Sequence, residues 1–254
     1  MKTLQDRAKD TSILIAAHRG ASKAAPENTI AAFKEAIKIG VDMIEIDVQF
    51  TKDGEIIVYH NDDIEFENKT VKIAELSYKQ IANYEITGTF ADKKFNEKIP
   101  TFKEVLALSK DNVYIVIEIK PFLTQDRAKD NLKNLCELIL ENDLQKYVIL
   151  ISFDLDNLIF IKKNYSELFT AAVYFPNSGI LPSQYAAKTQ CDAFICNITE
   201  LDEKKNTDAL ENNIFIGLYG VDSEDALEKA LKYDVKVIGS NIPDKMISYL
   251  QRLK

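Results

Sequence analysis

The chain contains only two histidines, and each of them ends a short apolar run. His18 follows residues 13–17, and His60 follows residues 56–59. Imidazole is the side chain that most readily exchanges protons near neutral pH. A pair of imidazoles suits a reaction in which one group removes a proton and another supplies one. A lone histidine in an apolar run is more often structural, so the case for catalysis depends on the residues between the two.

Acidic residues interrupt an apolar run between the histidines. Glu45 and Asp47 are two positions apart, so in a strand they face the same side. Buried carboxylates are costly without a partner, and either neighbouring Lys or Arg side chains or a divalent cation would neutralise them. The run 113–118 is similar, because it ends in Glu118 and Lys120 follows two residues later. If the two runs are neighbouring strands, Glu45, Asp47 and Glu118 form a set of oxygen ligands suited to Mg²⁺ or Ca²⁺.

Two cationic side chains beside these acids are suited to phosphate oxygens. Arg19 directly follows His18 and presents a forked guanidinium, although an ion pair with one of the acids is the alternative. Lys120 is expected to remain free of the acids and to hold an anion. Two imidazoles, a divalent cation and these two side chains together predict cleavage of a phosphodiester.

Composition restricts the partners that this chain is expected to have. Its 254 residues carry a formal net charge of −8, and no Lys or Arg cluster dominates, which argues against nucleic acid as a partner. No segment approaches the length of a membrane span, and the N-terminal residues lack a signal-peptide pattern, so we expect a cytoplasmic protein without stable membrane insertion. Cys136, Cys191 and Cys196 contain no CxxC pair and are expected to be buried thiols in a reducing compartment. The expected partner is a small-molecule phosphodiester, and a homo-oligomer is left open.

Strand-like and helical patterns alternate along the whole chain. Continuous apolar runs, typical of strands buried on both faces, occur at 12–17, 43–48, 113–118, 148–151, 170–174, 193–196, 214–218 and 235–238. Helical patterns follow at 29–39, 102–109, 125–141, 155–163, 183–189, 207–212, 223–232 and 244–253. Eight such repeats in a chain of this length predict an α/β protein with a (β/α)8 TIM barrel, and a doubly wound open sheet is the alternative. We expect Asn28 to cap the first of these helices and Gly40 to end it.

A hairpin is predicted directly after the second barrel strand. The segment 51–54 is a strong turn signal, so residues 55–59 should return antiparallel to the strand that carries the acids. A turn centred between residues 52 and 53 pairs Val58 with Asp47 and places His60 opposite Glu45. Residues 61–98 are then an insertion within a single domain spanning 1–254. It lies where barrels carry loops that cover the substrate.

These residues resemble the glycerophosphodiester phosphodiesterase family, within the superfamily of phospholipase C-like phosphodiesterases. The matching stretches are His18-Arg19-Gly20-Ala21-Ser22, Pro26-Glu27-Asn28-Thr29, residues 40–48, Thr51-Lys52-Asp53-Gly54 and Val58-Tyr59-His60, with further echoes in Ile99-Pro100-Thr101, Glu118-Ile119-Lys120 and Ser152-Phe153. The resemblance implies a TIM barrel that hydrolyses glycerophosphodiesters to glycerol 3-phosphate and an alcohol. It further implies that a hydroxyl of the glycerol is the first nucleophile.

The same resemblance implies a role for each candidate site residue. His18 and His60 would be the general acid/base pair, and Arg19 and Lys120 would hold the phosphate. The ligands of a divalent cation, Mg²⁺ or Ca²⁺, would be Glu45, Asp47 and Glu118.

The chain departs from the family around these residues. Asn61 stands where the family usually has Asp after the second histidine, and the final strand reads Ile238-Gly239-Ser240-Asn241-Ile242-Pro243 where the family usually has an acid before the proline. The chain has no Trp, and Tyr219 lies in the segment that usually carries one. We therefore expect Phe153, Tyr219 and the insertion 61–98 to set substrate identity. A related phospholipase-type enzyme acting on another lipid-derived phosphodiester, and a non-catalytic binder of phosphorylated ligands, are the alternatives.

Overall fold

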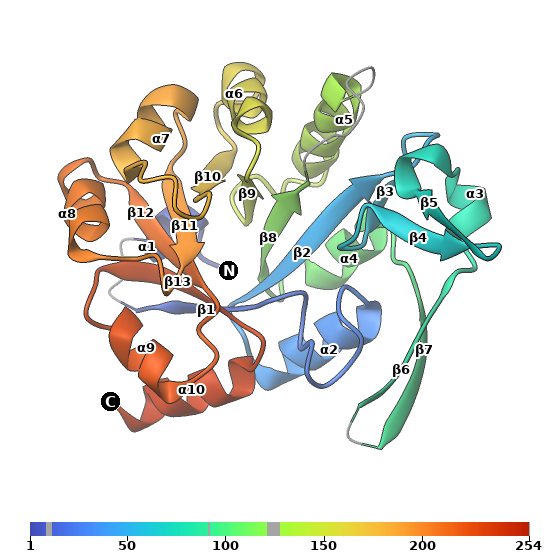
Figure 1. Cartoon of the computed structure of the whole chain (residues 1–254), viewed down its shortest axis with the longest axis horizontal. Coiled ribbons are helices and arrows are strands. Elements are labelled where there is room, and N and C mark those ends of the chain that lie inside the picture. Colours follow the sequence, from blue (N-terminus) through green and yellow to red (C-terminus); the bar gives the residue numbers. More distant parts are fainter. Residues whose placement is uncertain (9–11, 91, 121–127, 254) are drawn as a thin grey trace.

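Eight parallel strands form a closed ring in the computed structural model, which describes residues 1–8, 12–90, 92–120 and 128–253. The ring strands are β1 (Leu14–Ala17), β2 (Met43–Phe50), β8 (Tyr114–Ile119), β9 (Val148–Ser152), β10 (Phe169–Val173), β11 (Ala193–Asn197), β12 (Phe215–Tyr219) and β13 (Val235–Ser240). Each strand pairs with its sequence neighbour in the ring, and β1 closes it by pairing with both β2 and β13 (Figure 1). The TIM-barrel prediction is confirmed, and the open-sheet alternative is wrong.

Helices surround the ring on its outer side (Figure 1). They are α2 (Ile30–Ile39), α4 (Phe102–Ser109), α5 (Ala128–Glu141), α6 (Leu155–Asn164), α7 (Pro182–Thr189), α8 (Glu203–Glu211), α9 (Glu224–Ala230) and α10 (Pro243–Arg252). Helix α8 begins earlier than predicted because the side chain of Asp202 accepts a hydrogen bond from the Lys205 amide and caps it. The first residues of the helix predicted at 125–141, namely 125–127, lie outside the described residues. Among the described residues, no helix is both long and apolar enough to cross a membrane.

The cap of α2 is Thr29 rather than Asn28. The Thr29 hydroxyl accepts a hydrogen bond from the Ala32 amide at 3.2 Å, whereas Asn28 has a left-handed backbone, with φ of 55°, and turns its side chain elsewhere. The prediction for Asn28 was therefore wrong. Gly40 ends the helix as predicted, with φ of 86°, a conformation that glycine adopts without steric cost.

The antiparallel arm β3 (Ile56–Val58) pairs with β2 outside the ring. Val58 lies opposite Val48, so the register differs by one residue from the predicted pairing with Asp47. The cause is the turn, in which Thr51 pairs with Glu55 across three residues rather than two, and Gly54 takes the left-handed conformation with φ of 85°. The Tyr59 amide still donates to the Asp47 carbonyl at 2.9 Å, and His60 lies just beyond the ladder.

A small subdomain of hairpins and short helices occupies the predicted insertion. It contains β4 (Asp63–Phe66), β5 (Lys69–Lys72), the 3₁₀ helix η1 (Ile73–Glu75), α3 (Tyr78–Ile81), β6 (Glu85–Phe90) and β7 (Lys93–Lys98). The β6–β7 hairpin projects away from the ring (Figure 1). Ile64, Ile73 and Ile81 pack on Ile57 of the arm and on Ile99, so the segment shares one small core with the arm that precedes His60.

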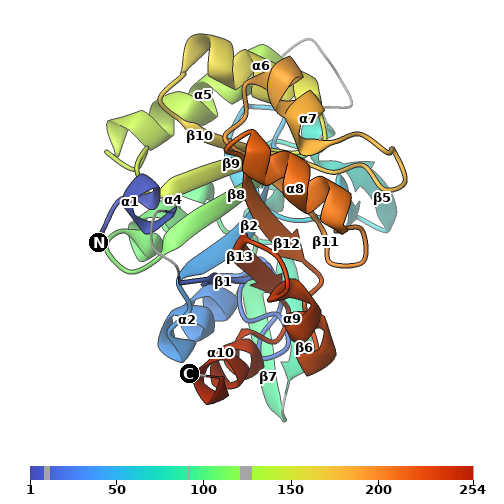
Figure 2. The same ribbon diagram turned by 90° about the vertical axis from the view of Figure 1, so that its left-hand side faces the viewer.

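A short helix, α1 (Leu4–Ala8), lies at one end of the ring (Figure 2). Leu4 belongs to the cluster of apolar side chains inside the ring, and its amide donates to the Lys146 carbonyl at 2.9 Å. The Tyr114 hydroxyl donates to the Lys2 carbonyl at 2.7 Å. The N-terminal segment therefore covers the end of the ring at which the strands begin.

Candidate active site

Three carboxylates meet at the ends of two neighbouring strands. Strands β2 and β8 are parallel partners in a register that sets Asp47 beside Glu118. Glu45 lies on the same side of β2 as Asp47. Each of the three acids offers an oxygen atom within 4.8 Å of the others. The structure thus brings together the predicted ligand set.

Asp47 is fully buried among positive and hydrogen-bonding partners. Lys120 Nζ lies 2.6 Å from its Oδ1, and Arg19 Nε lies 3.3 Å from its Oδ2. The Asn28 side chain donates to Oδ2 at 2.8 Å and accepts from the Asp47 amide at 3.2 Å. Burial alone would raise the pKa of Asp47, but Lys120, Arg19 and Asn28 outweigh it and hold the pKa below its usual value.

Lys120 is not free of the acids. Its ammonium lies 2.6 Å from Asp47 Oδ1 and 2.6 Å from Glu118 Oε1, so the prediction of an unpaired lysine was wrong. The reason is that Asp47 and Glu118 are register partners, which leaves the lysine two residues after Glu118 within reach of both. Arg19 likewise pairs with acids, because its second ion-pair partner is Glu27 at 2.9 Å.

A cation would relieve the cost of burying the Glu45 carboxylate and its repulsion from the neighbouring acids. Burial raises the pKa of Glu45 well above its usual value, and the charges of Asp47 and Glu118 add to the increase. One oxygen, Oε2, accepts a hydrogen bond from the Arg19 amide at 2.8 Å. The other, Oε1, is buried and has no hydrogen-bond partner among the described residues. An all-carboxylate donor set with an unpartnered buried oxygen fits a hard divalent cation.

The turn after β1 delivers a backbone donor to this cluster. Arg19 has a left-handed backbone with φ of 56°, and Gly20 follows with φ of 79°. A Cβ atom at Gly20 would lie 2.8 Å from Ala32, so the turn can pack on α2 only with glycine there. This conformation aims the Arg19 amide at Glu45.

His18 is held by a relay of two side chains, Asn241 directly after β13 and Asp222 in the loop after β12. Its Nδ1 lies 2.8 Å from Asn241 Oδ1, and its Nε2 lies 4.0 Å from Glu45 Oε2. The Asn241 side-chain nitrogen and backbone amide both donate to the Asp222 carboxylate at 2.7 Å, which fixes the amide with its oxygen toward the histidine. His18 Nδ1 must then donate the proton, so Nε2 of the neutral ring is the proton acceptor.

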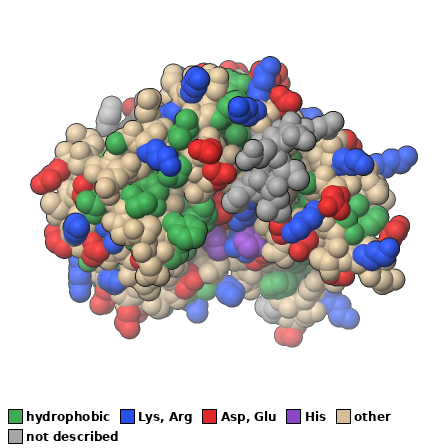
Figure 3. Space-filling view, turned by 45° about the horizontal axis from the view of Figure 1, so that its top comes forward, with side chains coloured by type: hydrophobic (Ala, Val, Ile, Leu, Met, Phe, Trp, Pro, Cys, Tyr) green, Lys and Arg blue, Asp and Glu red, His purple; other side chains and the backbone are tan. Residues whose placement is uncertain are grey.

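His60 reaches the same cavity from the arm. Its Nδ1 lies 2.9 Å from Asn61 Oδ1, and its carbonyl accepts a hydrogen bond from the Gln49 side chain at 3.3 Å. Figure 3 shows the histidine side chains in a hollow of the molecular surface. The predicted site residues that line one cavity are His18, Arg19, Glu45, His60, Glu118, Lys120, Phe153 and Tyr219. Asp47, the remaining one, lies beneath its surface.

Comparison with known proteins assigns the chain that forms this cavity to a family. A model described as the glycerophosphoryl diester phosphodiesterase family matches residues 18–245. The chain belongs to this family. It is accordingly an enzyme of the glycerophosphodiester phosphodiesterase class, a phosphoric diester hydrolase.

Two bacterial relatives match over nearly their whole length. A glycerophosphodiester phosphodiesterase of Caldanaerobacter subterraneus is 31% identical over 246 residues, which cover 94% of this chain and 98% of the relative. A putative glycerophosphodiester phosphodiesterase of Bacillus subtilis is 29% identical, with 92% and 96% covered.

Solved structures show the same fold at low sequence identity. A putative glycerophosphoryl diester phosphodiesterase of Silicibacter pomeroyi superposes with a TM-score of 0.85 at 18% identity, covering 95% of this chain and 94% of that one. A phosphodiesterase of Oleispira antarctica, solved in complex with the product sn-glycerol-3-phosphate, has a TM-score of 0.80 at 19% identity, with 96% and 99% covered.

Two positioning residues escaped the sequence analysis. Asn28 was read as a helix cap, although the adjacent Thr29 could serve that purpose and left Asn28 available for Asp47. Asn241 was covered only as part of the segment 238–243, which departs from the family. Its place directly after the last barrel strand, at the rim where barrel enzymes carry their site residues, is the signal that pointed to the site.

Proposed function

We propose that the enzyme hydrolyses glycerophosphodiesters to glycerol 3-phosphate and an alcohol, with a divalent cation and with His18 and His60 as the acid/base pair. The observation that carries the proposal is that both imidazoles line one cavity with the carboxylates Glu45 and Glu118. The product seen in the Oleispira antarctica relative supports the choice of substrate.

Each side chain has a task that its surroundings support. In the neutral ring of His18, Nε2 is the atom that can accept a proton, because Asn241 Oδ1 accepts the hydrogen bond from Nδ1. One histidine takes the proton of the attacking hydroxyl, and the other gives a proton to the oxygen of the departing alcohol. Arg19 and Lys120 bring positive charge to the phosphate oxygens.

The metal ligands proposed are Glu45, Asp47 and Glu118, which would hold Mg²⁺ or Ca²⁺. When bound, the cation neutralises charge that develops on the phosphate oxygens. Phe153 and Tyr219 line the same cavity, and we assign them to contacts with the rest of the substrate.

We also propose that residues 1–254 act as one domain with an insertion at about 61–98, in the cytoplasm. The insertion shares its core with Ile57 and Ile99, which supports the first part. Cys136, Cys191 and Cys196 are free and buried, as suits a reducing compartment. Fractionation of cells that produce the protein tests the location.

The test is release of glycerol 3-phosphate from glycerophosphocholine, glycerophosphoethanolamine and glycerophosphoglycerol. We expect turnover that EDTA abolishes and that Mg²⁺ or Ca²⁺ restores, and we expect His18→Ala to lose at least about a hundredfold. Lys38→Ala, on the exposed face of α2, is the control and should match the wild type.

Two outcomes would count against parts of the proposal. Turnover that persists in EDTA excludes the metal, and full activity in His18→Ala excludes the acid/base role. Thermal stabilisation by glycerol 3-phosphate without turnover of any diester would instead identify a non-catalytic binder.

A further inference from the structure

The cavity that contains the catalytic residues continues into the interior of the barrel. Barrel interiors are ordinarily filled by layers of bulky side chains. Here the inner lining includes the small residues Ala16, Ala171, Ala193, Gly217 and Gly239, and the whole cavity, its active-site end included, has a volume of about 290 Å³. The lumen, as we call this space inside the ring below Glu45, ends at Leu4 of α1, which also lines it.

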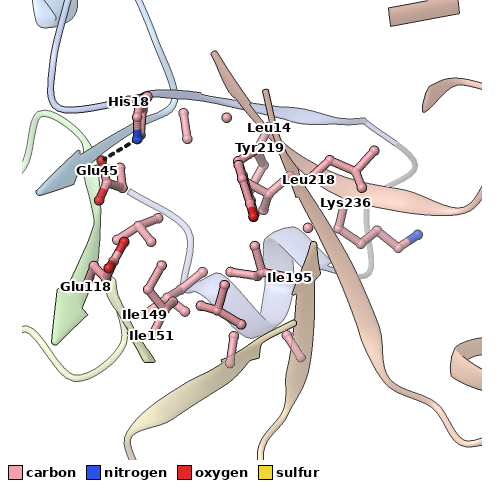
Figure 4. A pocket seen from close by; sticks show the side chains of 18 of the residues that line it. Leu14, His18, Glu45, Glu118, Ile149, Ile151, Ile195, Leu218, Tyr219 and Lys236 are labelled. Atoms are coloured by element: carbon pink, nitrogen blue, oxygen red, sulfur yellow. Dashed lines mark ion pairs between the residues drawn. The ribbon is translucent and has the colours of Figure 1, made fainter. Parts of the chain in front are cut away.

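The walls of the lumen are apolar. Ile149 and Ile151 line it beside Glu118, and Ile195 lines it farther around the ring (Figure 4). Ile195 is partly accessible, although its strand is part of the closed ring. Apolar side chains that keep accessible surface inside a closed ring indicate unfilled space, because packed interiors leave few voids of this size.

The charged residues at the far end of the lumen are already paired. Arg7 Nη2 lies 3.2 Å from Asp42, and Lys236 Nζ lies 2.9 Å from Asp234. A polar head group in the lumen would therefore lose its hydration against apolar walls, which is unfavourable. An unbranched aliphatic chain gains from the same transfer and is narrow enough to enter a ring.

We propose that the lumen receives one unbranched aliphatic chain of a phosphodiester whose phosphate is held beside His18 and Glu45. The preferred substrates are then glycerophosphodiesters that carry a single aliphatic chain. This inference rests on the function proposed above. The chain can be attached to the departing alcohol or to the glycerol, and the two cases share the chemistry of the lumen.

Two substrate series test the inference and separate these cases. One consists of glycerophospho-n-alkanols from ethyl to dodecyl, and the other of monoacyl glycerophosphocholines of increasing chain length, all below their micelle-forming concentrations. In the series whose chain enters the lumen, KM should fall up to about fourfold per added methylene and then level off where the chain meets Leu4. The series that responds identifies the position of the chain.

Variants of the lumen give a matched comparison. Ala193→Leu should reduce the ratio of kcat/KM for a decyl substrate to that for glycerophosphocholine, because the added side chain occupies the lumen. Ile195→Ala enlarges the space and should move the levelling-off to a longer chain. Ala187→Leu makes the same change as the first variant on the exposed surface of α7 and should keep the wild-type ratio.

Equilibrium binding of decylphosphocholine separates failure of this inference from failure of the proposed function. If no diester is hydrolysed, the proposed function fails, but binding to the wild type that weakens in Ala193→Leu still supports the lumen. A KM independent of chain length in both series, or a ratio unchanged in both Ala193→Leu and Ile195→Ala, overturns the inference. Should Ala193→Leu not fold, Ile195→Ala and the two series decide the question alone.

Discussion

Removing and returning divalent ions should change the stability of the folded protein. Glu45, Asp47 and Glu118 present oxygens within 4.8 Å of one another, and Glu45 Oε1 has no hydrogen-bond partner among the described residues. The three carboxylates come together only when β2 and β8 pair, so an ion bound by all three binds the folded chain and not the unfolded one. Such an ion stabilises the folded state by mass action.

The size of the effect follows from linkage. At a free ion concentration about a hundred times the Kd, the free energy of unfolding rises by about 2.7 kcal/mol. For a domain of this size each kcal/mol raises Tm by about 2–4 °C, so the expected increase is roughly 5–10 °C. Glu45→Gln keeps the size of the side chain and removes its charge. It should therefore raise Tm in the ion-free state, by relieving repulsion from Asp47 and Glu118, and remove most of the ion-dependent increase.

Thermal unfolding of chelator-treated protein, titrated with MgCl₂ or CaCl₂ at constant ionic strength, measures both quantities. Glu211→Gln, which alters an exposed glutamate on α8, should keep the full increase. An equal increase in Glu45→Gln and the wild type would refute the reasoning, as would an equal increase with NaCl. A lower ion-free Tm in Glu45→Gln would show that the repulsion is already relieved by other means.

Three further predictions concern other parts of the chain. Asn241→Ala should lower kcat about 10–100-fold with little change in KM, because His18 loses the group that fixes its tautomer. Steady-state kinetics measures the loss of kcat, and ¹⁵N NMR of the imidazole detects the change of tautomer. Asn28→Ala should lower the free energy of unfolding, measured with urea, by about 3 kcal/mol. The variant loses the hydrogen bonds to buried Asp47, and alanine adopts the left-handed backbone of this position less readily than asparagine. Burial raises the pKa of Cys136 and of Cys196 to about 12, so only the unfolded chain ionises these thiols between pH 9 and 12. Stability should fall with rising pH there, by up to about 1.4 kcal/mol per pH unit for each thiol, and the slope should be smaller in Cys136→Ala.

The barrel and most of its site were predictable because they depend on local patterns. Apolar runs without alternation mark strands that are buried on both faces, and a helix followed nearly every one. Glu45, Asp47 and Glu118 stood out because acids interrupt such runs. Neighbouring strands in a barrel are consecutive parallel strands of the chain, which was enough to bring Glu118 to the other two.

The wrong or missed predictions concern features that depend on turn geometry or on residues far apart in the sequence. The number of residues in the turn at Gly54 sets the register of the arm. The turn contains one residue more than predicted, so every pair between the arm and β2 is shifted by one residue. Lys120 looked free because sequence spacing does not show that Asp47 lies opposite Glu118 and therefore within reach of the lysine ammonium. The relay from Asp222 through Asn241 to His18 joins opposite ends of the chain, and nothing local predicts it.

The contacts of Asp47 make assembly of the active site depend on closure of the ring. Its partners come from the turn after β1, from the residue before the cap of α2 and from the end of β8, so they converge only when β2 is paired on both sides. An incompletely closed ring would leave this carboxylate either hydrated or unpaired, and Glu45 and Glu118, the other proposed cation ligands, would separate from it. During refolding, recovery of activity should therefore coincide with completion of the barrel rather than with the appearance of helices.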